Sequence, residues 1–351
     1  KTKKLECGQM RFFVMDEADR LVSDRDTMRC LMTIFDALPK GAECIGADRL
    51  QVCFFSATLH SDAIANLADR ICHRPTWVDL KGKDAIPDAV HHVVVRVEGG
   101  GGGDAGRVQD GASGYKTDGV HDGDVAAAAG AISAGDSAMK AASLSVKQQK
   151  PALLRALIDA HNMSQAMVFC RTNLDCDLLA AYLNRAGSAG AAAGTVNPYA
   201  CRVLAGGKNQ NQRRAALAAF KRGECRFLIC TDVAARGIDV KGLPYVINMT
   251  LPDEAENYIH RIGRVGRATC PGIAVSFVAT CSEKVWYYDK RKWAKRKLSV
   301  RLASDGGCCI WYDEPGLLVE VEARLKQPIQ ELGPGPDFTM PAKSARARAE
   351  A

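Results

Sequence analysis

Residues 226–239 read RFLICTDVAARGID, a short apolar run followed at once by a polar segment that contains a glycine. Short apolar runs bounded by turn residues are typical of strands buried in a parallel sheet. Similar runs recur along the chain and alternate with segments of helical period, so the sequence predicts an α/β fold in which helices cover parallel sheets. The strands are expected at residues 12–15, 52–55, 93–97, 166–170, 201–204, 226–230, 245–249 and 273–278.

Low-complexity stretches interrupt this pattern. Residues 98–145 are mostly Gly, Ala, Asp and Ser, which bury too little apolar surface to offset the entropy of ordering, so we expect a disordered insertion there. We predict one unit over residues 1–85, a second over residues 86–300, and an extension over residues 301–351 whose last part is disordered. The helices are expected at residues 26–38, 151–161, 174–186, 212–221 and 254–263.

The composition favours a globular protein in a reducing compartment. The chain has 351 residues with 47% hydrophobic and 25% charged residues, enough for about two domains. Its 14 cysteines are scattered and form no Cys-x-x-Cys pair, which favours free thiols in the cytosol or nucleus over a zinc site. The net charge of +7 mildly favours a polyanionic partner. Because the first residue is Lys rather than Met, we expect the chain to be part of a longer protein.

Three acids follow the first predicted strand. Asp16, Glu17 and Asp19 come directly after residues 12–15. In open α/β sheets ligands bind at the carboxyl ends of the strands, where these acids would emerge. In nucleotide hydrolysis one carboxylate holds magnesium and a second takes the proton of the attacking water. An acidic first helical turn explains the same residues, and they alone do not decide between the two interpretations.

Two hydroxyl side chains follow the next strand. Ser56 and Thr58 could donate hydrogen bonds to an acid such as Asp19 if the two strands are neighbours. A helix cap before Leu59 is an equally good local explanation.

A basic cluster occupies residues 260–267. His260, Arg264 and Arg267 are spaced i, i+4, i+7, so a helix running through them would align them on one face. Guanidinium groups stabilise the charge on a transferring phosphoryl group. A solvated basic helix face is the alternative.

Taken in order, these motifs resemble those of the DEAD-box RNA helicases. The resemblance covers residues 11 to about 280 without the insertion, and residues 75–82, 91–95 and 305–312 resemble the subfamily that carries a SPRY insert. The matching motifs are Asp16-Glu17-Ala18-Asp19, Ser56-Ala57-Thr58, Val168-Phe169-Cys170-Arg171-Thr172, Gln210-x-x-Arg213, Thr231-Asp232 through Arg236-Gly237-Ile238-Asp239, and His260 to Arg267.

The resemblance implies an ATP-dependent RNA helicase with two RecA-like domains, of which the first is partial here. Its cofactors would be ATP and Mg²⁺, its partner RNA with little sequence specificity, and its location the nucleus and cytoplasm. Asp16 would hold magnesium through water and Glu17 would polarise the attacking water. The other implied roles are coupling of hydrolysis to domain closure (Asp19, Ser56, Thr58, His260), contact with the nucleotide (Gly237, Asp239, Arg264, Arg267, the two arginines at the γ-phosphate), and RNA binding (Arg171, Thr172, Gln210, Arg213, Thr231, Arg236).

Two departures from the family pattern are visible. Ala205-Gly206 stands where the family usually has His-Gly, which puts one polar contact near the domain interface in doubt. The chain contains no Gly-x-x-x-x-Gly-Lys-Ser/Thr phosphate-binding loop, so we expect little ATP hydrolysis by the chain alone. A non-catalytic RNA-binding scaffold and a DNA helicase of the same superfamily are the rival hypotheses.

Aromatic and basic residues interleave over residues 284–301. Such a mixture suits single-stranded nucleic acid, so we consider an auxiliary RNA surface there. A helix with an aromatic inner side and a solvated basic outer side is the alternative.

Overall fold

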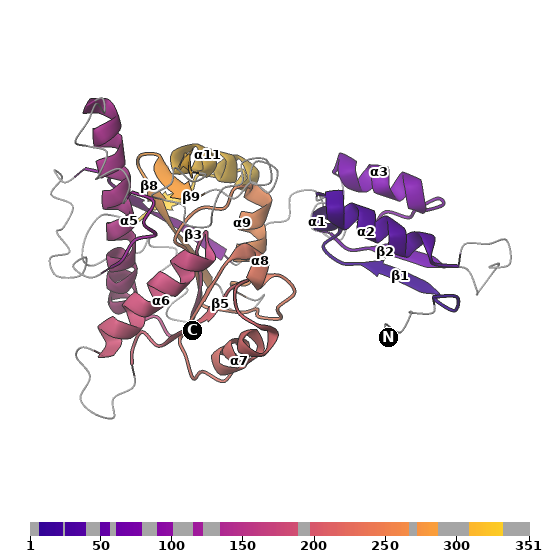
Figure 1. Cartoon of the computed structure of the whole chain (residues 1–351), viewed down its shortest axis with the longest axis horizontal. Coiled ribbons are helices and arrows are strands. Elements are labelled where there is room, and N and C mark those ends of the chain that lie inside the picture. Colours follow the sequence, from indigo (N-terminus) through magenta and orange to yellow (C-terminus); the bar gives the residue numbers. More distant parts are fainter. Residues whose placement is uncertain are drawn as a thin grey trace. The chain divides into compact units, whose positions relative to one another are not determined.

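The computed structural model describes residues 7–39 apart from residue 24, and residues 50–56, 61–78, 90–100, 115–121, 134–188, 197–266, 272–286 and 309–332. The chain divides into two compact units, Lys1–Ala85 and Ile86–Ala351 (Figure 1).

The first unit contains a short parallel sheet covered by helices. Side chains alternate along β1, so that Met15 is buried while Phe12 and Val14 are 65% and 56% exposed. Met15 packs with Leu31 and Ile64, which come from two of the helices. The elements are β1 (Phe12–Met15), α1 (Ala18–Ser23), α2 (Arg25–Asp36), β2 (Gln51–Phe54), which pairs in parallel with β1, and α3 (Asp62–Ile71).

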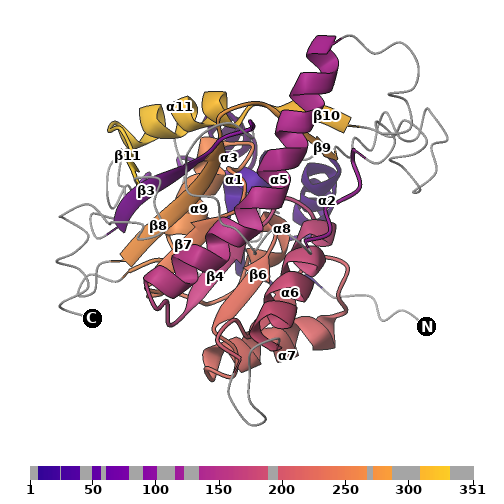
Figure 2. The same cartoon turned by 90° about the vertical axis from the view of Figure 1, so that its left-hand side faces the viewer.

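The second unit is built on a seven-stranded sheet in which every pairing is parallel. All residues of β4, β6, β7 and β8 are buried, as continuous apolar runs predict for strands covered on both faces. The strands lie in the order β11 (Gln330–Glu331), β3 (Val90–Val97), β8 (Gly272–Ala279), β7 (Tyr245–Asn248), β4 (Ala166–Phe169), β6 (Phe227–Cys230) and β5 (Cys201–Leu204). Figure 2 shows this order from β11 to β6.

Helices cover both faces of this sheet (Figure 1). Leu154 and Leu179, from α5 (Ala134–Ala160) and α6 (Asn173–Ser188), belong to one buried cluster with alternate residues of the central strands. Phe220, Tyr258 and Leu318 belong to the cluster on the other face. They come from α7 (Gln210–Lys221), α9 (Ala255–Ile262) and α11 (Glu314–Leu325), and the short helix α8 (Asp232–Ala235) lies with them. The predicted α/β fold, with helices on parallel sheets, is therefore confirmed.

Part of the predicted disordered insertion is ordered. Residues 134–145 form the first turns of α5, and in residues 115–121 the side chains of Val120 and His121 are 2% and 3% exposed. The ring of Tyr115 lies edge-on to that of Tyr182, with 5.7 Å between their centroids. The prediction of disorder is wrong for these two stretches, because a few large side chains pack onto the second unit.

The segment after residue 308 also belongs to the second unit. A two-stranded antiparallel ribbon joins β9 (Glu283–Trp286) to β10 (Cys309–Tyr312), with Tyr312 opposite Glu283. Further along, α11 packs against α9, and β11 pairs with β3 at the edge of the large sheet. The predicted boundary near residue 300 therefore does not separate residues 309–332 from the domain.

A buried cluster of charges fixes this segment to the unit. Glu314 is fully buried, and its carboxylate accepts hydrogen bonds from Lys150 Nζ at 2.7 Å, Leu251 N at 3.1 Å and Ala279 N at 2.7 Å. Lys150 also pairs with the buried carboxylate of Glu283. Burial raises the pKa of Glu314 to about 7, whereas Lys150 offsets the effect of burial on Glu283 and lowers its pKa. One cation on α5 therefore pairs with two buried acids, one on β9 and one on α11, and the cluster joins these three elements.

We predict that Lys150→Met destabilises the second unit by about 3–5 kcal/mol, because it leaves two buried carboxylates without their cation. Urea unfolding followed by fluorescence measures the change. Lys208→Met is the matched control, since Lys208 pairs with Asp177 at 2.9 Å while 35% and 50% of the two side chains are exposed. The control should lose less than about 1 kcal/mol. Equal losses in the two variants would contradict the importance of the buried cluster.

Candidate functional site

The predicted catalytic acids lie at the turn that follows β1. Asp16 is exposed and Glu17 is half-buried. Glu17 has a φ of +48°, and its N–H donates a hydrogen bond to Asp16 Oδ1 at 3.0 Å. Few residues other than glycine adopt this left-handed conformation, and it is often found at functional sites. The turn presents both carboxylates beyond the carboxyl end of the strand, where the sequence pattern predicts them.

Asp19 and Ser56 are brought together by the neighbouring strands. Ser56 Oγ donates a hydrogen bond to Asp19 Oδ1 at 2.8 Å, and Ala18 N donates to Phe55 O at 3.0 Å. The hydrogen bond predicted between an acid of the first motif and a hydroxyl of the second is therefore present. Thr58 lies outside the described residues. The next helix, α3, has Ser61 as its N-cap residue, so Ser56 does not cap it.

The basic residues do not form the predicted helix face. α9 ends at Ile262 with Gly263 as its C-cap, so His260 lies on the helix and Arg264 lies in the turn beyond it. Arg267 is outside the described residues. The prediction of one helical face through all three residues is wrong, because α9 ends at Ile262, two residues after His260.

Arg264 instead reaches the loop that follows α8. Its Nη1 donates to Ile238 O, and its Nη2 donates to Ala235 O at 3.3 Å. Gly237 lies between these two acceptors with a φ of +64°, which favours glycine. Asp239, the next predicted nucleotide contact, is 89% exposed and lines an open hollow of about 720 Å³ together with Gly263. The structure thus gathers three of the predicted nucleotide-binding residues, Gly237, Asp239 and Arg264, in one region.

Arg261 has a structural role that the sequence interpretation missed. It is 3% exposed, and its Nε and Nη2 donate to the two carboxylate oxygens of Asp232 at 2.6 and 2.7 Å. Its Nη1 donates to Asn248 Oδ1 at 2.9 Å and to Thr250 O at 2.7 Å. This guanidinium joins α9 to the carboxyl ends of β6 and β7. Its place in the apolar stripe of α9, beside Tyr258, could have indicated that it points inward.

The predicted RNA-binding residues follow strands or begin helices at the carboxyl edge of the large sheet. Arg213 on α7 donates from Nη2 to Ala234 O at 3.1 Å, which holds α7 against α8. Gln210 is exposed at the start of α7, and the buried Thr231 is the N-cap residue of α8. Arg236 is half-buried at the end of α8. These four residues therefore belong to two adjacent helices.

Arg171 and Thr172 follow β4 at the same edge. Arg171 Nη1 donates to Asp253 Oδ1 at 2.6 Å, and the guanidinium carbon lies 4.2 Å from the centroid of the Tyr312 ring. Thr172 Oγ1 donates to Asp175 Oδ2 at 2.6 Å. Burial raises the pKa of Asp175. Both predicted RNA ligands are thus held by neighbouring side chains of the second unit.

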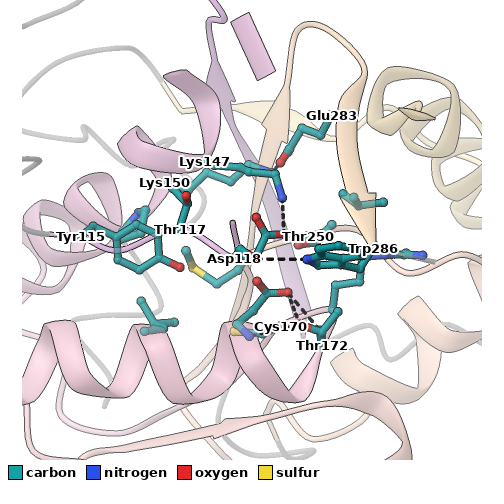
Figure 3. Close-up of a pocket in the computed structure, with 16 residues that line it drawn as sticks. Tyr115, Thr117, Asp118, Lys147, Lys150, Cys170, Thr172, Thr250, Glu283 and Trp286 are labelled. Carbon is teal, nitrogen blue, oxygen red and sulfur yellow. Dashed lines mark hydrogen bonds and ion pairs between the residues drawn. The ribbon is translucent and has the colours of Figure 1, made fainter. Parts of the chain in front are cut away.

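A small cavity of about 60 Å³ adjoins Thr172 (Figure 3). Asp118, from the ordered part of the insertion, pairs with Lys147 Nζ at 2.6 Å and accepts at its main-chain oxygen from Trp286 Nε1 at 3.1 Å. Figure 3 shows these side chains around the space next to Thr172. A space of this size holds a few water molecules and is small for a nucleotide.

Comparison with known proteins decides the family. Residues 149–269 match the model of the helicase conserved C-terminal domain. Over 337 residues the chain is 39% identical to ATP-dependent RNA helicase Ddx1 of Drosophila virilis, an alignment that covers 90% of the chain and 77% of that relative. The chain belongs to the DDX1 family of DEAD-box RNA helicases.

Other DDX1 relatives are longer than this chain. ATP-dependent RNA helicase DDX1 of Xenopus laevis is 43% identical over 335 residues, which are 95% of the chain and 43% of the relative. The chain therefore spans about two fifths of the length of this relative and of the similarly matched Drosophila melanogaster Ddx1. Among solved structures, S. cerevisiae Dbp5 bound to RNA and ADP BeF3 is 19% identical, with a TM-score of 0.59 over 98% of this chain and 63% of that chain. This likeness shows the RecA-like fold.

Two kinds of feature are absent from the described part of this DDX1-family chain. None of its helices combines the length and the apolar composition that a membrane span needs. No three or more His, Cys, Asp or Glu side chains in those ranges are grouped so that they could hold a metal ion.

We predict that Arg261→Lys destabilises this DDX1-family chain by about 2–4 kcal/mol. Lysine keeps the charge but lacks the planar fork that pairs with both oxygens of Asp232, so buried acceptors lose their donors. Thermal unfolding measures the loss. Arg214→Lys on the exposed side of α7 is the control and should leave the unfolding temperature unchanged. An Arg261→Lys variant with an unchanged unfolding temperature would show that the pairing of the guanidinium with both oxygens of Asp232 is not needed for stability.

Proposed function

We propose that the protein containing this chain is an ATP-dependent RNA helicase that hydrolyses ATP to bind, bend and unwind or remodel RNA duplexes and ribonucleoproteins. One observation carries this proposal. A DDX1-family chain has the acids Asp16, which is exposed, and Glu17, which is half-buried, at a strand end, and it has Arg264 at the loop of residues 235–238. A protein that served only as an RNA-binding scaffold would not require these groups.

In the nucleotide reaction, Glu17 orients and polarises the attacking water, and Asp16 holds magnesium through water. The exposed carboxylate of Asp16 would suit this ion, because magnesium usually keeps several water ligands and is seldom bound by protein groups alone. Magnesium would neutralise phosphate charge when bound. Arg264 and Arg267 contact the γ-phosphate, and Gly237 and Asp239 contact the rest of the nucleotide. Asp19, Ser56, Thr58 and His260 couple hydrolysis to closure of the two domains.

On the RNA side, Arg171, Thr172, Gln210, Arg213, Thr231 and Arg236 hold phosphates and 2′-hydroxyls of one strand. Contacts with the backbone position a strand without reading its bases, so the substrate is RNA of broad sequence. The 2′-hydroxyl contacts make RNA a better ligand than DNA of the same sequence. We propose that the protein is located in the nucleus and cytoplasm. The auxiliary surface suggested for residues 284–301 falls largely outside the described residues.

We predict that Arg213→Ala weakens binding of single-stranded RNA by about three- to tenfold and lowers the slope of log affinity against log salt by about one, since one phosphate contact is lost. Fluorescence anisotropy at several salt concentrations measures both values. Arg214→Ala is the matched control because Arg214 is the next residue of the same helix and is exposed. RNA should also outcompete DNA. If the two variants behave alike, or if DNA competes equally, the proposed RNA site is wrong.

We predict that the 351-residue chain hydrolyses ATP no faster than its Glu17→Gln variant, with or without RNA, because its sequence has no Gly-x-x-x-x-Gly-Lys-Ser/Thr loop. In a longer form of the protein that includes such a loop, Glu17→Gln should retain ATP and RNA but abolish turnover. Arg264→Ala should reduce turnover with little effect on RNA binding. A phosphate-release assay measures all three. Robust RNA binding without turnover in the longer form would support a scaffold instead.

A further inference from the structure

Tyr312 lies against a residue of the proposed RNA site although it belongs to the segment after residue 300. We propose that Tyr312 is a positioning residue for RNA binding, because its ring and the carboxylate of Asp253 hold the guanidinium of Arg171 in place for an RNA phosphate. This inference rests on the proposed function, in which Arg171 contacts the RNA backbone.

The Arg171 guanidinium is held from two directions. Its carbon lies 4.2 Å from the centroid of the Tyr312 ring, and its Nη1 donates to Asp253 Oδ1 at 2.6 Å. Stacking on an aromatic ring and pairing with a carboxylate together fix the plane of the group. An arginine that is already held loses less side-chain freedom when it binds a phosphate.

Tyr312 is itself fixed by the loop that carries Asp253. Its hydroxyl donates to Leu251 O at 2.8 Å, while Leu251 N donates to Glu314 Oε1 at 3.1 Å. Tyr312 and Glu314 of the carboxyl-terminal segment thus both bond to Leu251, Tyr312 at its carbonyl oxygen and Glu314 at its N–H. Asp253 follows two positions later, so the ring and the carboxylate that contact Arg171 belong to one connected framework.

This framework rests on the buried charge cluster. Besides Leu251, Glu314 accepts from Ala279 N at 2.7 Å and from Lys150 Nζ at 2.7 Å. Tyr312 is 6% exposed and Glu314 is fully buried. The ring is therefore set by the ends of β7 and β8 and by α5, which gives it little freedom to move away from Arg171.

The site remains accessible to a ligand. The side chain of Arg171 is 14% exposed and that of Asp253 is 62% exposed, so solvent reaches their pair from the side of Asp253. Within the described part of the chain, Arg171 Nε is buried without a hydrogen-bond partner, so this nitrogen is not the group that a ligand would meet first. A purely structural role for Arg171, in which it only ties the carboxyl-terminal segment to the sheet, is the reading that the experiment must exclude.

The test is a double-mutant cycle on RNA binding by the 351-residue chain. Anisotropy of a labelled single-stranded RNA is measured over a range of salt concentrations for Arg171→Ala, Tyr312→Leu, the double variant and Tyr312→Phe. We expect each of the first two to weaken binding about three- to tenfold and to lower the salt slope by about one. The double variant should be no weaker than Arg171→Ala alone, because both changes remove one contact. Tyr312→Phe keeps the ring and should retain most of the affinity.

Trp311→Leu is the matched control, since Trp311 is the preceding residue of β10 and is 38% exposed. It should leave the salt slope unchanged. Losses that multiply in the double variant, or a Tyr312→Leu variant with an unchanged salt slope, would overturn the proposal. An unaffected Arg171→Ala variant would overturn it too, whereas Arg213→Ala reports separately on the RNA site as a whole. Thermal unfolding checks each variant, and Tyr312→Met replaces Tyr312→Leu if the latter does not fold.

Discussion

The burial of the central strands along their whole length decides where polar side chains can lie in the second unit. Every residue of β4, β6, β7 and β8 is buried, so neither face of these four strands can carry a binding site. Because all strands run in parallel, their carboxyl ends meet at one edge, and the chain can change there from apolar to polar within one residue. Cys170 and Cys230 are the last buried apolar residues before the polar residues Arg171 and Thr231. The polar site is therefore a consequence of the apolar sheet.

The charged side chains at this edge include a buried set and a set of guanidinium groups, and the buried set fixes the position of the guanidinium groups. Arg261 and Glu314 are buried, and every partner named for them comes from the second unit itself. Such buried groups stabilise a fold only when their partners are complete, so they fix the segment after β7, where both make hydrogen bonds. Arg171 pairs with Asp253 of that segment, and Arg264 follows α9, the helix of Arg261. A rigid inner set of charges thus determines where the outer guanidinium groups stand.

The strands could be predicted from the sequence because a buried strand needs an unbroken apolar run, and each predicted strand is present. The site was predictable to the extent that its residues follow those strands, as the Asp19–Ser56 hydrogen bond shows. The end of α9 at Ile262 was missed because three basic residues at helical spacing are compatible with a longer helix. The place of Arg261 in the apolar stripe of α9 is compatible with burial, but its partners Asp232 and Asn248 are distant in the sequence, so their pairing with it could not be predicted.

The ordered part of the insertion and the carboxyl-terminal segment were missed for a related reason. Composition measures how much apolar surface a segment could bury by itself, whereas Val120 and Tyr312 are buried against residues that the rest of the unit supplies. A segment of low apolar content can be ordered by a few such contacts when the surface that receives them is already rigid. In this way Glu314, which accepts hydrogen bonds from Lys150, Leu251 and Ala279, fixes a segment that was predicted to be an extension outside the domain.

The groups proposed to bind the nucleotide are each prepared within their own unit. The left-handed turn at Glu17 is joined to the end of β2 by the hydrogen bond from Ala18 to Phe55, and Arg264 is held by the main-chain carbonyls of Ala235 and Ile238. To bind a phosphate, Arg264 must exchange these acceptors. That exchange costs little, because water can satisfy the carbonyls that Arg264 leaves and a phosphate forms stronger, charge-assisted hydrogen bonds with its guanidinium. Arg261, three residues earlier, is in contrast buried and uses all three of its guanidinium nitrogens for partners within the unit.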